Sequence, residues 1–141
     1  MPRVELGCCR RSFAPFANGT DTNNPAVLQT LETAQSVANL EDQLARAGPV
    51  SVSIDATPTD FYYYGGGVYD NKACTSYELD HSVLAVGYGV EAGTKYWIVK
   101  NSWSSYWGEE GFVRVAYDGP KGVNICGVAT TPNYVMNTTL P

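Results

Sequence analysis

Short segments that alternate apolar with small or polar residues constrain the fold of this chain more than any other feature. Residues 50–54 and 111–117 have this pattern, and residues 81–88 and 96–100 are predicted to form two more strands; turns rich in glycine separate several of these segments. A period of two places one face of a strand on a core and the other toward solvent. Residues 128–135 are expected to close the same sheet. The pattern predicts an antiparallel sheet or an open barrel.

One segment has a helical period instead. In residues 38–47, Leu40 and Leu44 lie four positions apart, and a Gly-Pro pair follows the run. Apolar residues at this spacing share one face of a helix. We therefore expect one short amphipathic helix, with Ser36 or Asn39 as its N-cap.

Composition sets the class of protein. The 141 residues fit one domain, and a hydrophobic content of 44% with 16% charged residues is typical of a globular chain. The net charge of −5 makes nucleic acid a poor candidate partner. No run of apolar residues approaches the roughly 18 needed to span a membrane, and residues 1–11 lack the apolar stretch of a secretory signal.

The only histidine, His81, opens one predicted strand directly after Asp80, and Asn101 ends the next strand. A lone histidine is more often a surface residue or a satisfied core residue. Here, however, an antiparallel hairpin brings the two positions side by side. An amide oxygen can orient an imidazole, and imidazoles exchange protons near neutral pH. The pair is therefore a candidate catalytic base with its orienting group.

Other motifs are weaker. Residues 65–67, three glycines, lack the Lys-Ser/Thr of a phosphate-binding loop and are predicted to form a tight turn. The preceding tyrosines, residues 62–64, are expected to pack against the barrel. One histidine and no Cys-x-x-Cys leave too few ligands for zinc, so we expect no metal and no other cofactor.

Several segments resemble the C-terminal half of the papain-like cysteine proteases, in the order and approximate spacing of that family. The matching segments are residues 48–56 (GPVSVSIDA), 61–70 (FYYYGGGVYD), 79–89 (LDHSVLAVGYG), 96–103 (YWIVKNSW), 107–113 (WGEEGFV) and 124–130 (NICGVAT). Because these blocks are independent of one another, a chance match is very improbable.

The resemblance implies an α+β fold: the mainly antiparallel β half-barrel of the papain-like fold, with one short helix and with the helical lobe absent. Residues 1–141 would then form a single domain that corresponds to the C-terminal lobe. Within it, residues 1–37 would be an irregular connecting segment, and residues 38–135 the barrel lobe.

The resemblance also assigns catalytic roles. His81 would be the general base that forms an ion pair with a cysteine thiolate, and Asn101 would orient its ring. Trp103 and Trp107 would shield the bond between them from water, although both indoles are equally compatible with simple core packing. The family usually has glycine at the position of Ser104, and a larger residue there could shift Trp103 and its turn.

A substrate pocket follows from the same resemblance. Its walls would include Ser53, Ser82 and Thr131, small polar residues that suggest a roomy pocket without fixed charge and a preference for hydrophobic side chains. The family usually has glycine or alanine at Ser82. The alternative is that Ser53 and Thr131 merely fit a crowded strand.

The resemblance further suggests that Cys74 and Cys126 form a disulfide bond. Family members usually work in lysosomes, in vacuoles or outside the cell, and two Asn-x-Thr sequons, at Asn18 and Asn137, are compatible with a secretory route. The start of this chain does not explain how it would enter that route.

The cysteine nucleophile is expected to be missing. Family members carry a C-G-S/A-C-W/Y block roughly 130–150 residues before the histidine, and this sequence has no such block. Cys8 and Cys9 are too close to His81 in sequence, and no aromatic residue follows them. They resemble a disulfide segment of the family instead.

The sequence therefore predicts the His/Asn half of a cysteine endopeptidase that acts on peptides or proteins and is inactive alone. Its partner would be the missing N-terminal helical lobe that carries the nucleophile. The alternative function is a non-catalytic interaction module with a papain-like fold. No arrangement of Ser or Thr with His81 suggests an autonomous hydrolase.

Overall fold

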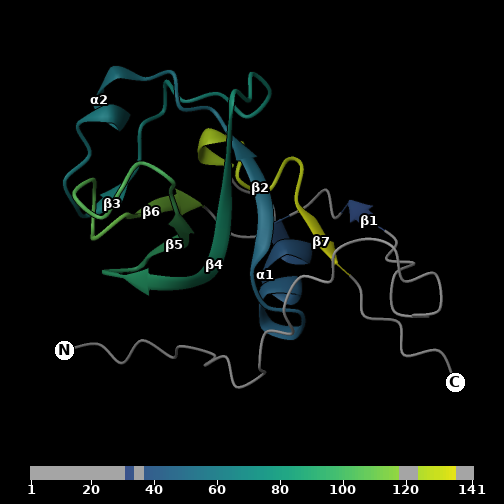
Figure 1. The fold of residues 1–141 in the computed structure, drawn as a ribbon. Helices are drawn as coiled ribbons and strands as arrows, with labels where there is room; N and C mark the ends of the chain where they lie inside the picture. The colour runs from purple at the N-terminus through teal and green to yellow at the C-terminus, as the bar shows by residue number, and fades with distance from the viewer. Residues whose placement is uncertain (1–30, 34–36, 118–123, 136–141) are drawn as a thin grey trace, which may run out of the picture.

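A single seven-stranded sheet organises the structure, a computed structural model that describes residues 31–33, 37–117 and 124–135 (Figure 1). The strands follow the order β1-β7-β2-β4-β5-β6-β3, and every pair is antiparallel except β3 with β6. The strands are β1 (Leu31–Thr33), β2 (Val50–Ile54), β3 (Val68–Tyr69), β4 (His81–Glu91), β5 (Thr94–Lys100), β6 (Phe112–Tyr117) and β7 (Asn133–Val135). The expected class, α+β with a mainly antiparallel sheet, is confirmed.

The β4–β5 hairpin is tighter than the sequence suggested. The predicted strands, residues 81–88 and 96–100, leave a loop between them that contains Gly89, Gly93 and Thr94, but the ladder continues to the Glu91–Thr94 pair. Only Ala92 and Gly93 form the turn, with φ of 49° and 86°. A two-residue hairpin turn of type I′ needs positive φ at both central positions, and glycine adopts positive φ without strain. The loop prediction was therefore wrong for Gly89 and Thr94, which both lie in strands.

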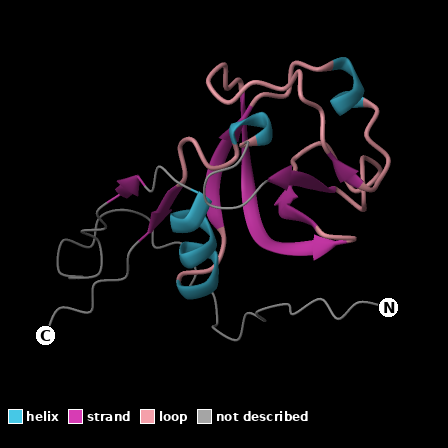
Figure 2. Cartoon of the chain, turned by 180° about the vertical axis from the view of Figure 1, so that it is seen from behind, coloured by secondary structure: helices cyan, strands magenta, loops and turns pink. Residues whose placement is uncertain are grey.

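β4 is long and strongly curved, as both ribbon views show (Figures 1 and 2). Its register with β5 shifts between Ala85 and Gly87, which marks a β-bulge. A bulge bends its strand and increases the local twist. The first half of β4 therefore pairs with β2 while the second half follows β5, and His81 lies at the start of the β2-paired half.

Helix α1 (Val37–Arg46) packs against the sheet beside β2 and β4 (Figure 2). Leu40 is fully buried and Leu44 packs partly against the core, as their spacing predicted. The helix ends before Gly48, whose φ of 94° is the left-handed conformation common after helix C-termini. Strand residues complete this core: Val50, Val52, Ile54, Val83, Ala85, Trp97, Val99, Val113 and Val115.

Other expectations differ in detail. Ser36 lies outside the described residues, and Asn39 lies within α1, so it is not the N-cap. The segment expected to be irregular, residues 1–37, includes β1, which pairs with β7. The closing strand covers only Asn133–Val135, because a short 3-10 helix (Ile125–Gly127) and a turn precede it.

A second helix, the one-turn α2 (Thr59–Tyr62), was not expected. The tyrosines at its end were predicted to pack against the barrel, but only Tyr64 is buried. Tyr62 and Tyr63 are 54% and 83% exposed. Gly66 and Gly67 form a bend where a tight turn was expected, and Glu109 accepts a hydrogen bond from the Gly67 N–H at 2.9 Å. Within the described ranges, no helix is long and apolar enough to span a membrane.

Candidate active site

His81 and Asn101 are joined by a hydrogen bond. His81 Nε2 lies 2.8 Å from Asn101 Oδ1. The histidine begins β4, and Asn101 directly follows β5, so the hairpin places both at the same end of the sheet. Asn101 is buried and His81 is half-buried, so the imidazole keeps access to solvent while its partner does not.

The local backbone determines which atom carries the proton. The N–H of Ser102 donates to Asn101 Oδ1 at 2.7 Å, and an N–H can only donate. The oxygen of the amide must therefore face both Ser102 and His81. Because this oxygen can only accept, the bond requires the proton on Nε2 of the neutral imidazole. Nδ1 is left with a free lone pair that can accept a proton.

Asp80 fixes the backbone at His81. Its carboxylate accepts a hydrogen bond from the Ala56 N–H at 2.8 Å, and its own N–H donates to the Ile54 carbonyl at 3.0 Å. These bonds join the start of β4 to the end of β2, where Ile54 and His81 are register partners. Sequence reasoning noted Asp80 only as the residue before His81.

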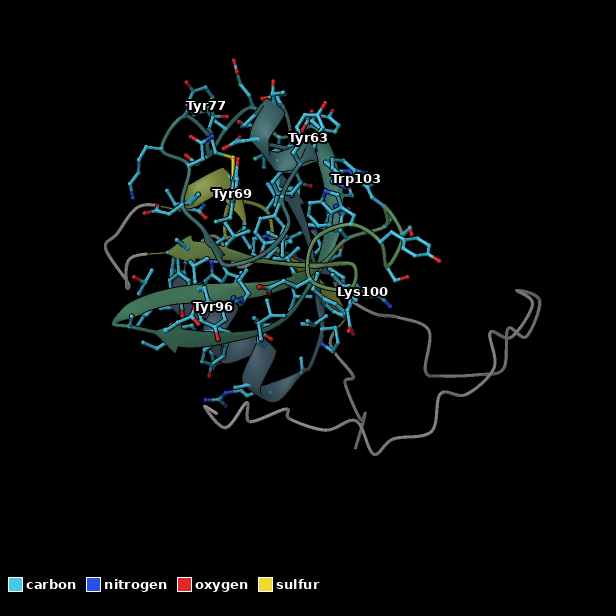
Figure 3. The ribbon with its side chains drawn as sticks, turned by 90° about the vertical axis from the view of Figure 1, so that its left-hand side faces the viewer. Tyr63, Tyr69, Tyr77, Tyr96, Lys100 and Trp103 are labelled. Carbon is cyan, nitrogen blue, oxygen red and sulfur yellow. A yellow bond between two sulfur atoms is a disulfide. The ribbon has the colours of Figure 1, made fainter. Side chains whose placement is uncertain are left out.

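A group of aromatic rings lies beside His81. The Trp103 ring centroid lies 5.1 Å from that of His81. Phe61 and Trp107 both pack edge-on against Trp103, with ring centroids 5.6 Å and 5.3 Å away. We call Phe61, Trp103 and Trp107 the aromatic cover. Figure 3 shows Trp103 on the same side of the molecule as the exposed Tyr63.

The turn after Trp103 is held in an unusual conformation. Ser104 has φ of 82°, in the left-handed region that favours glycine. Its carbonyl accepts the Trp107 N–H at 3.3 Å, and its hydroxyl accepts the Tyr106 N–H at 3.2 Å. Ser104, which stands where the family usually has glycine, therefore lies at a position where a side chain is strained. The turn forms nevertheless.

An ion pair fixes the other end of that turn. The Glu109 carboxylate accepts hydrogen bonds from Arg114 Nε and Nη2 at 2.8 and 2.7 Å. The bonds from Arg114 hold the pKa of Glu109 below its ordinary value, against the opposing effect of burial. Since Glu109 also binds the Gly67 N–H, it joins the glycine bend to β6.

The disulfide bond between Cys74 and Cys126 is confirmed, with a sequence separation of 52 between its cysteines. A buried carboxylate that sequence reasoning missed lies beside it. Asp55 is 1% exposed and accepts hydrogen bonds from the Thr57 N–H, the Thr57 hydroxyl and the Thr75 N–H. Burial alone would raise the pKa of Asp55, but the hydrogen bonds together outweigh it and lower this pKa.

The three predicted pocket residues lie on neighbouring strands. Ser53 and Ser82 are register partners in β2 and β4. Thr131 precedes β7, which pairs with β2 through Asn133. A hollow of about 330 Å³ opens near Asn101, and of the three residues only Ser82 lines it. Its other lining residues are Ser51, Val83, Leu84, Lys100, Asn101 and Ser102.

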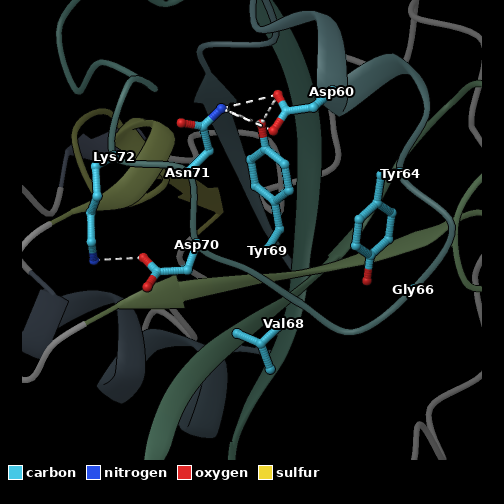
Figure 4. Close-up of a pocket in the computed structure, with 8 residues that line it drawn as sticks. All are labelled: Asp60, Tyr64, Gly66, Val68, Tyr69, Asp70, Asn71 and Lys72. Carbon is cyan, nitrogen blue, oxygen red and sulfur yellow. Dashed lines mark hydrogen bonds and ion pairs between the residues drawn. The ribbon is translucent and has the colours of Figure 1, made fainter.

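A larger hollow, of about 440 Å³, lies elsewhere (Figure 4). Its lining includes neither His81 nor Asn101, and its polar groups bind one another. Asp60 accepts hydrogen bonds from Tyr69 and Asn71, and Lys72 pairs with Asp70. Because these groups bind one another and the smaller hollow is lined by Asn101, the smaller hollow is the better candidate for the site.

Both cysteines within the described ranges, Cys74 and Cys126, are in the disulfide bond, so the described part of the chain offers His81 no free thiol. Cys8 and Cys9 lie outside the described residues. The described part also contains no cluster of three or more His, Cys, Asp or Glu residues that could hold a metal.

Residues 15–136 match the family described as "Papain family cysteine protease". The chain is 50% identical over 98 residues to a cathepsin L-like peptidase of Aedes aegypti, covering 69% of this chain and 28% of that protein. It is 40% identical over 116 residues to digestive cysteine proteinase 3 of Homarus americanus, covering 81% of this chain and 35% of that protein.

Solved structures agree with the sequence match. Digestive procathepsin L 3 from the larval midgut of Tenebrio molitor superposes with a TM-score of 0.66 at 40% identity, covering 76% of this chain and 34% of that one. Bromelain from Ananas comosus, solved with the E64 inhibitor, gives 0.65 at 34% identity, covering 75% and 49%. The chain spans about a third of the length of the curated relatives it matches.

Proposed function

The chain belongs to the papain family of cysteine proteases, and we propose that it is the His/Asn lobe of a cysteine peptidase, with residues 38–135 as the barrel lobe. The observation that carries this proposal is the 2.8 Å bond from His81 Nε2 to Asn101 Oδ1 beneath Trp103. A helical lobe would supply the cysteine.

In this proposal His81 Nδ1 is the catalytic base. Nδ1 takes the proton of the cysteine thiol, and the resulting imidazolium forms an ion pair with the thiolate. The thiolate then attacks the carbonyl carbon of the peptide bond. The proton returns from Nδ1 to the leaving amine, and water later hydrolyses the acyl-enzyme. Asn101 keeps the second proton on Nε2 throughout, and Trp103 and Trp107 limit the access of water to that bond.

We propose Ser53, Ser82 and Thr131 as one wall of a substrate pocket for peptide side chains. Small residues leave space, which supports a preference for apolar side chains. Lys100 at the rim of the neighbouring hollow adds one positive charge that sequence reasoning did not anticipate. The opposite wall would belong to the helical lobe.

We also propose that the protein works in an oxidising compartment, such as a lysosome, a vacuole or the extracellular space. The Cys74–Cys126 disulfide bond supports this, because disulfides persist mainly in such compartments. The names of the lobster and beetle relatives, which are digestive proteinases, are consistent with it.

The test is reconstitution. The 141-residue chain is mixed with the separately expressed helical lobe of the Tenebrio molitor relative, and cleavage of a dipeptidyl fluorogenic substrate is followed. We expect no turnover by the chain alone, turnover in the mixture that a thiol alkylator blocks, and none with His81→Ala. Alkylator-sensitive turnover by the chain alone would contradict the proposal that it is inactive by itself.

A non-catalytic interaction module is the competing function. It predicts a stable complex with the helical lobe, detected by size-exclusion chromatography, that never cleaves the substrate. That outcome would refute the catalytic proposal, because His81 and Asn101 would then be in place beside a competent cysteine without effect.

A further inference from the structure

Tyr62 adds a ring to the aromatic cover that sequence reasoning did not assign. Its ring stacks on the Trp103 indole with centroids 5.0 Å apart and an interplanar angle of 11°. Trp103 in turn contacts His81 at 5.1 Å. A continuous series of ring contacts therefore links the exposed residue Tyr62 to the imidazole through Trp103.

The backbone beneath Tyr62 is fixed rather than free. The Trp107 Nε1–H lies within hydrogen-bonding distance of the Phe61 and Tyr62 carbonyls, at 3.2 and 3.1 Å. Phe61 is fully buried and packs edge-on against Trp103. The Trp107 indole thus holds the end of α2, and this places the Tyr62 ring against the Trp103 indole.

Stacking at this geometry restricts Trp103. Parallel aromatic rings attract beyond the effect of the area they bury, so the stacked Tyr62 ring favours the orientation that the Trp103 indole has beside His81. Tyr63, the next residue, is 83% exposed and makes no ring contact among the described residues. Of the two exposed tyrosines at the end of α2, only Tyr62 can act on the indole.

We propose that Tyr62 is a positioning residue that acts through Trp103 to keep water from the His81–Asn101 hydrogen bond. The proposal rests on the function proposed above, since it gives Tyr62 a role in the same site. Its prediction concerns the Nε2 proton itself: with Tyr62 present, this proton exchanges slowly with water, and loss of the ring accelerates the exchange.

The single histidine makes this measurable, because one imidazole gives one set of ring resonances. The exchange rate of the His81 Nε2 proton with water is measured by NMR in the ¹⁵N-labelled 141-residue chain. In Tyr62→Ala we expect acceleration on the order of fivefold to tenfold, the ratio that about 1–1.4 kcal/mol of lost stacking produces. Tyr62→Phe, which keeps the ring, and Tyr63→Ala, the matched control, should exchange at the wild-type rate.

Unchanged NMR chemical shifts of the Trp97 indole, which is fully buried, show that a variant is folded. If Tyr62→Ala does not fold, Tyr62→Leu is used in its place, and the same acceleration of exchange is expected. The proposal would be overturned if the His81 Nε2 proton of folded Tyr62→Ala exchanged at the wild-type rate, or if Tyr63→Ala accelerated the exchange equally. The exchange measurement does not depend on peptidase activity. If Tyr62→Ala accelerates the exchange as expected but the reconstituted mixture does not cleave the substrate, only the proposed function is refuted. If the mixture cleaves the substrate but the Nε2 proton already exchanges fast in the wild-type chain, only the role of Tyr62 is refuted.

Discussion

Replacing Asp55 with asparagine tests how the end of β2 is held near the site. The carboxylate is 1% exposed and accepts three hydrogen bonds, two on Oδ1 and one, from the Thr75 N–H at 2.7 Å, on Oδ2. In the asparagine variant an amide NH₂ group can face the Thr75 N–H, so two donors meet without an acceptor. A buried donor left unsatisfied costs about 1–3 kcal/mol, and a hydrogen bond to a charged group contributes about 1.5–3 kcal/mol.

We therefore expect Asp55→Asn to lower the free energy of unfolding by about 2–4 kcal/mol at neutral pH. Because the pKa of Asp55 is lowered by folding, its contribution is fully present above the pKa of an unfolded aspartate, about 3.9. The contribution is lost as the pH falls through the lower folded value. The difference between wild type and variant should shrink in that acidic range.

Urea denaturation followed by tryptophan fluorescence, at neutral pH and at several acidic values, measures both quantities. Asp70→Asn is the matched control, since the Asp70 side chain is 45% exposed and forms an ion pair with Lys72 at the surface; we expect a change within about 0.5 kcal/mol. An unchanged denaturation midpoint in Asp55→Asn would refute the reasoning, and so would a difference that does not vary with pH.

Three other changes have defined outcomes. Ser104→Gly removes the side chain of a residue whose φ is 82°, so it should raise the free energy of unfolding by about 0.5–1 kcal/mol. A melting temperature no higher than that of the control Ser105→Gly would contradict this. Replacing Cys74 and Cys126 together by serine opens a cross-link of 52 residues and should cost about 4 kcal/mol by loop entropy; chemical denaturation with an unshifted midpoint would exclude this. Asn101→Ala in the reconstituted peptidase should lower kcat/KM by about 10–100-fold, and a wild-type pH–rate profile with unchanged kcat/KM would speak against an orienting role.

The helix and strands whose apolar residues recur at a regular spacing could be predicted from the sequence. Leu40 and Leu44 define the buried side of α1, and the alternation in residues 50–54 matches the observed β2. The proximity of His81 and Asn101 also followed from the hairpin, because consecutive antiparallel strands return to the same end of the sheet.

What escaped prediction depends on tertiary contacts. Helix α2 is one turn long and has no period to detect; the Trp107 indole fixes it from 45 residues away. The buried Asp55 could not be recognised because aspartate is usually exposed, and its donors at Thr57 and Thr75 meet only in the folded chain. Of the tyrosines at the end of α2, composition alone could not tell that Tyr62 would stack on Trp103 while Tyr63 faces solvent.

The protonation of a single imidazole is the most direct test of the site. The ¹⁵N chemical shifts of the two ring nitrogens of His81, followed through its titration, report where the proton resides in the neutral ring. With Asn101 Oδ1 accepting from Nε2 at 2.8 Å, the neutral ring should carry its proton on Nε2 and leave Nδ1 unprotonated, and Asn101→Ala should allow both tautomers. A neutral ring protonated on Nδ1 in the wild-type chain, or a tautomer mixture that Asn101→Ala leaves unchanged, would contradict the assignment of His81 as a base oriented by Asn101.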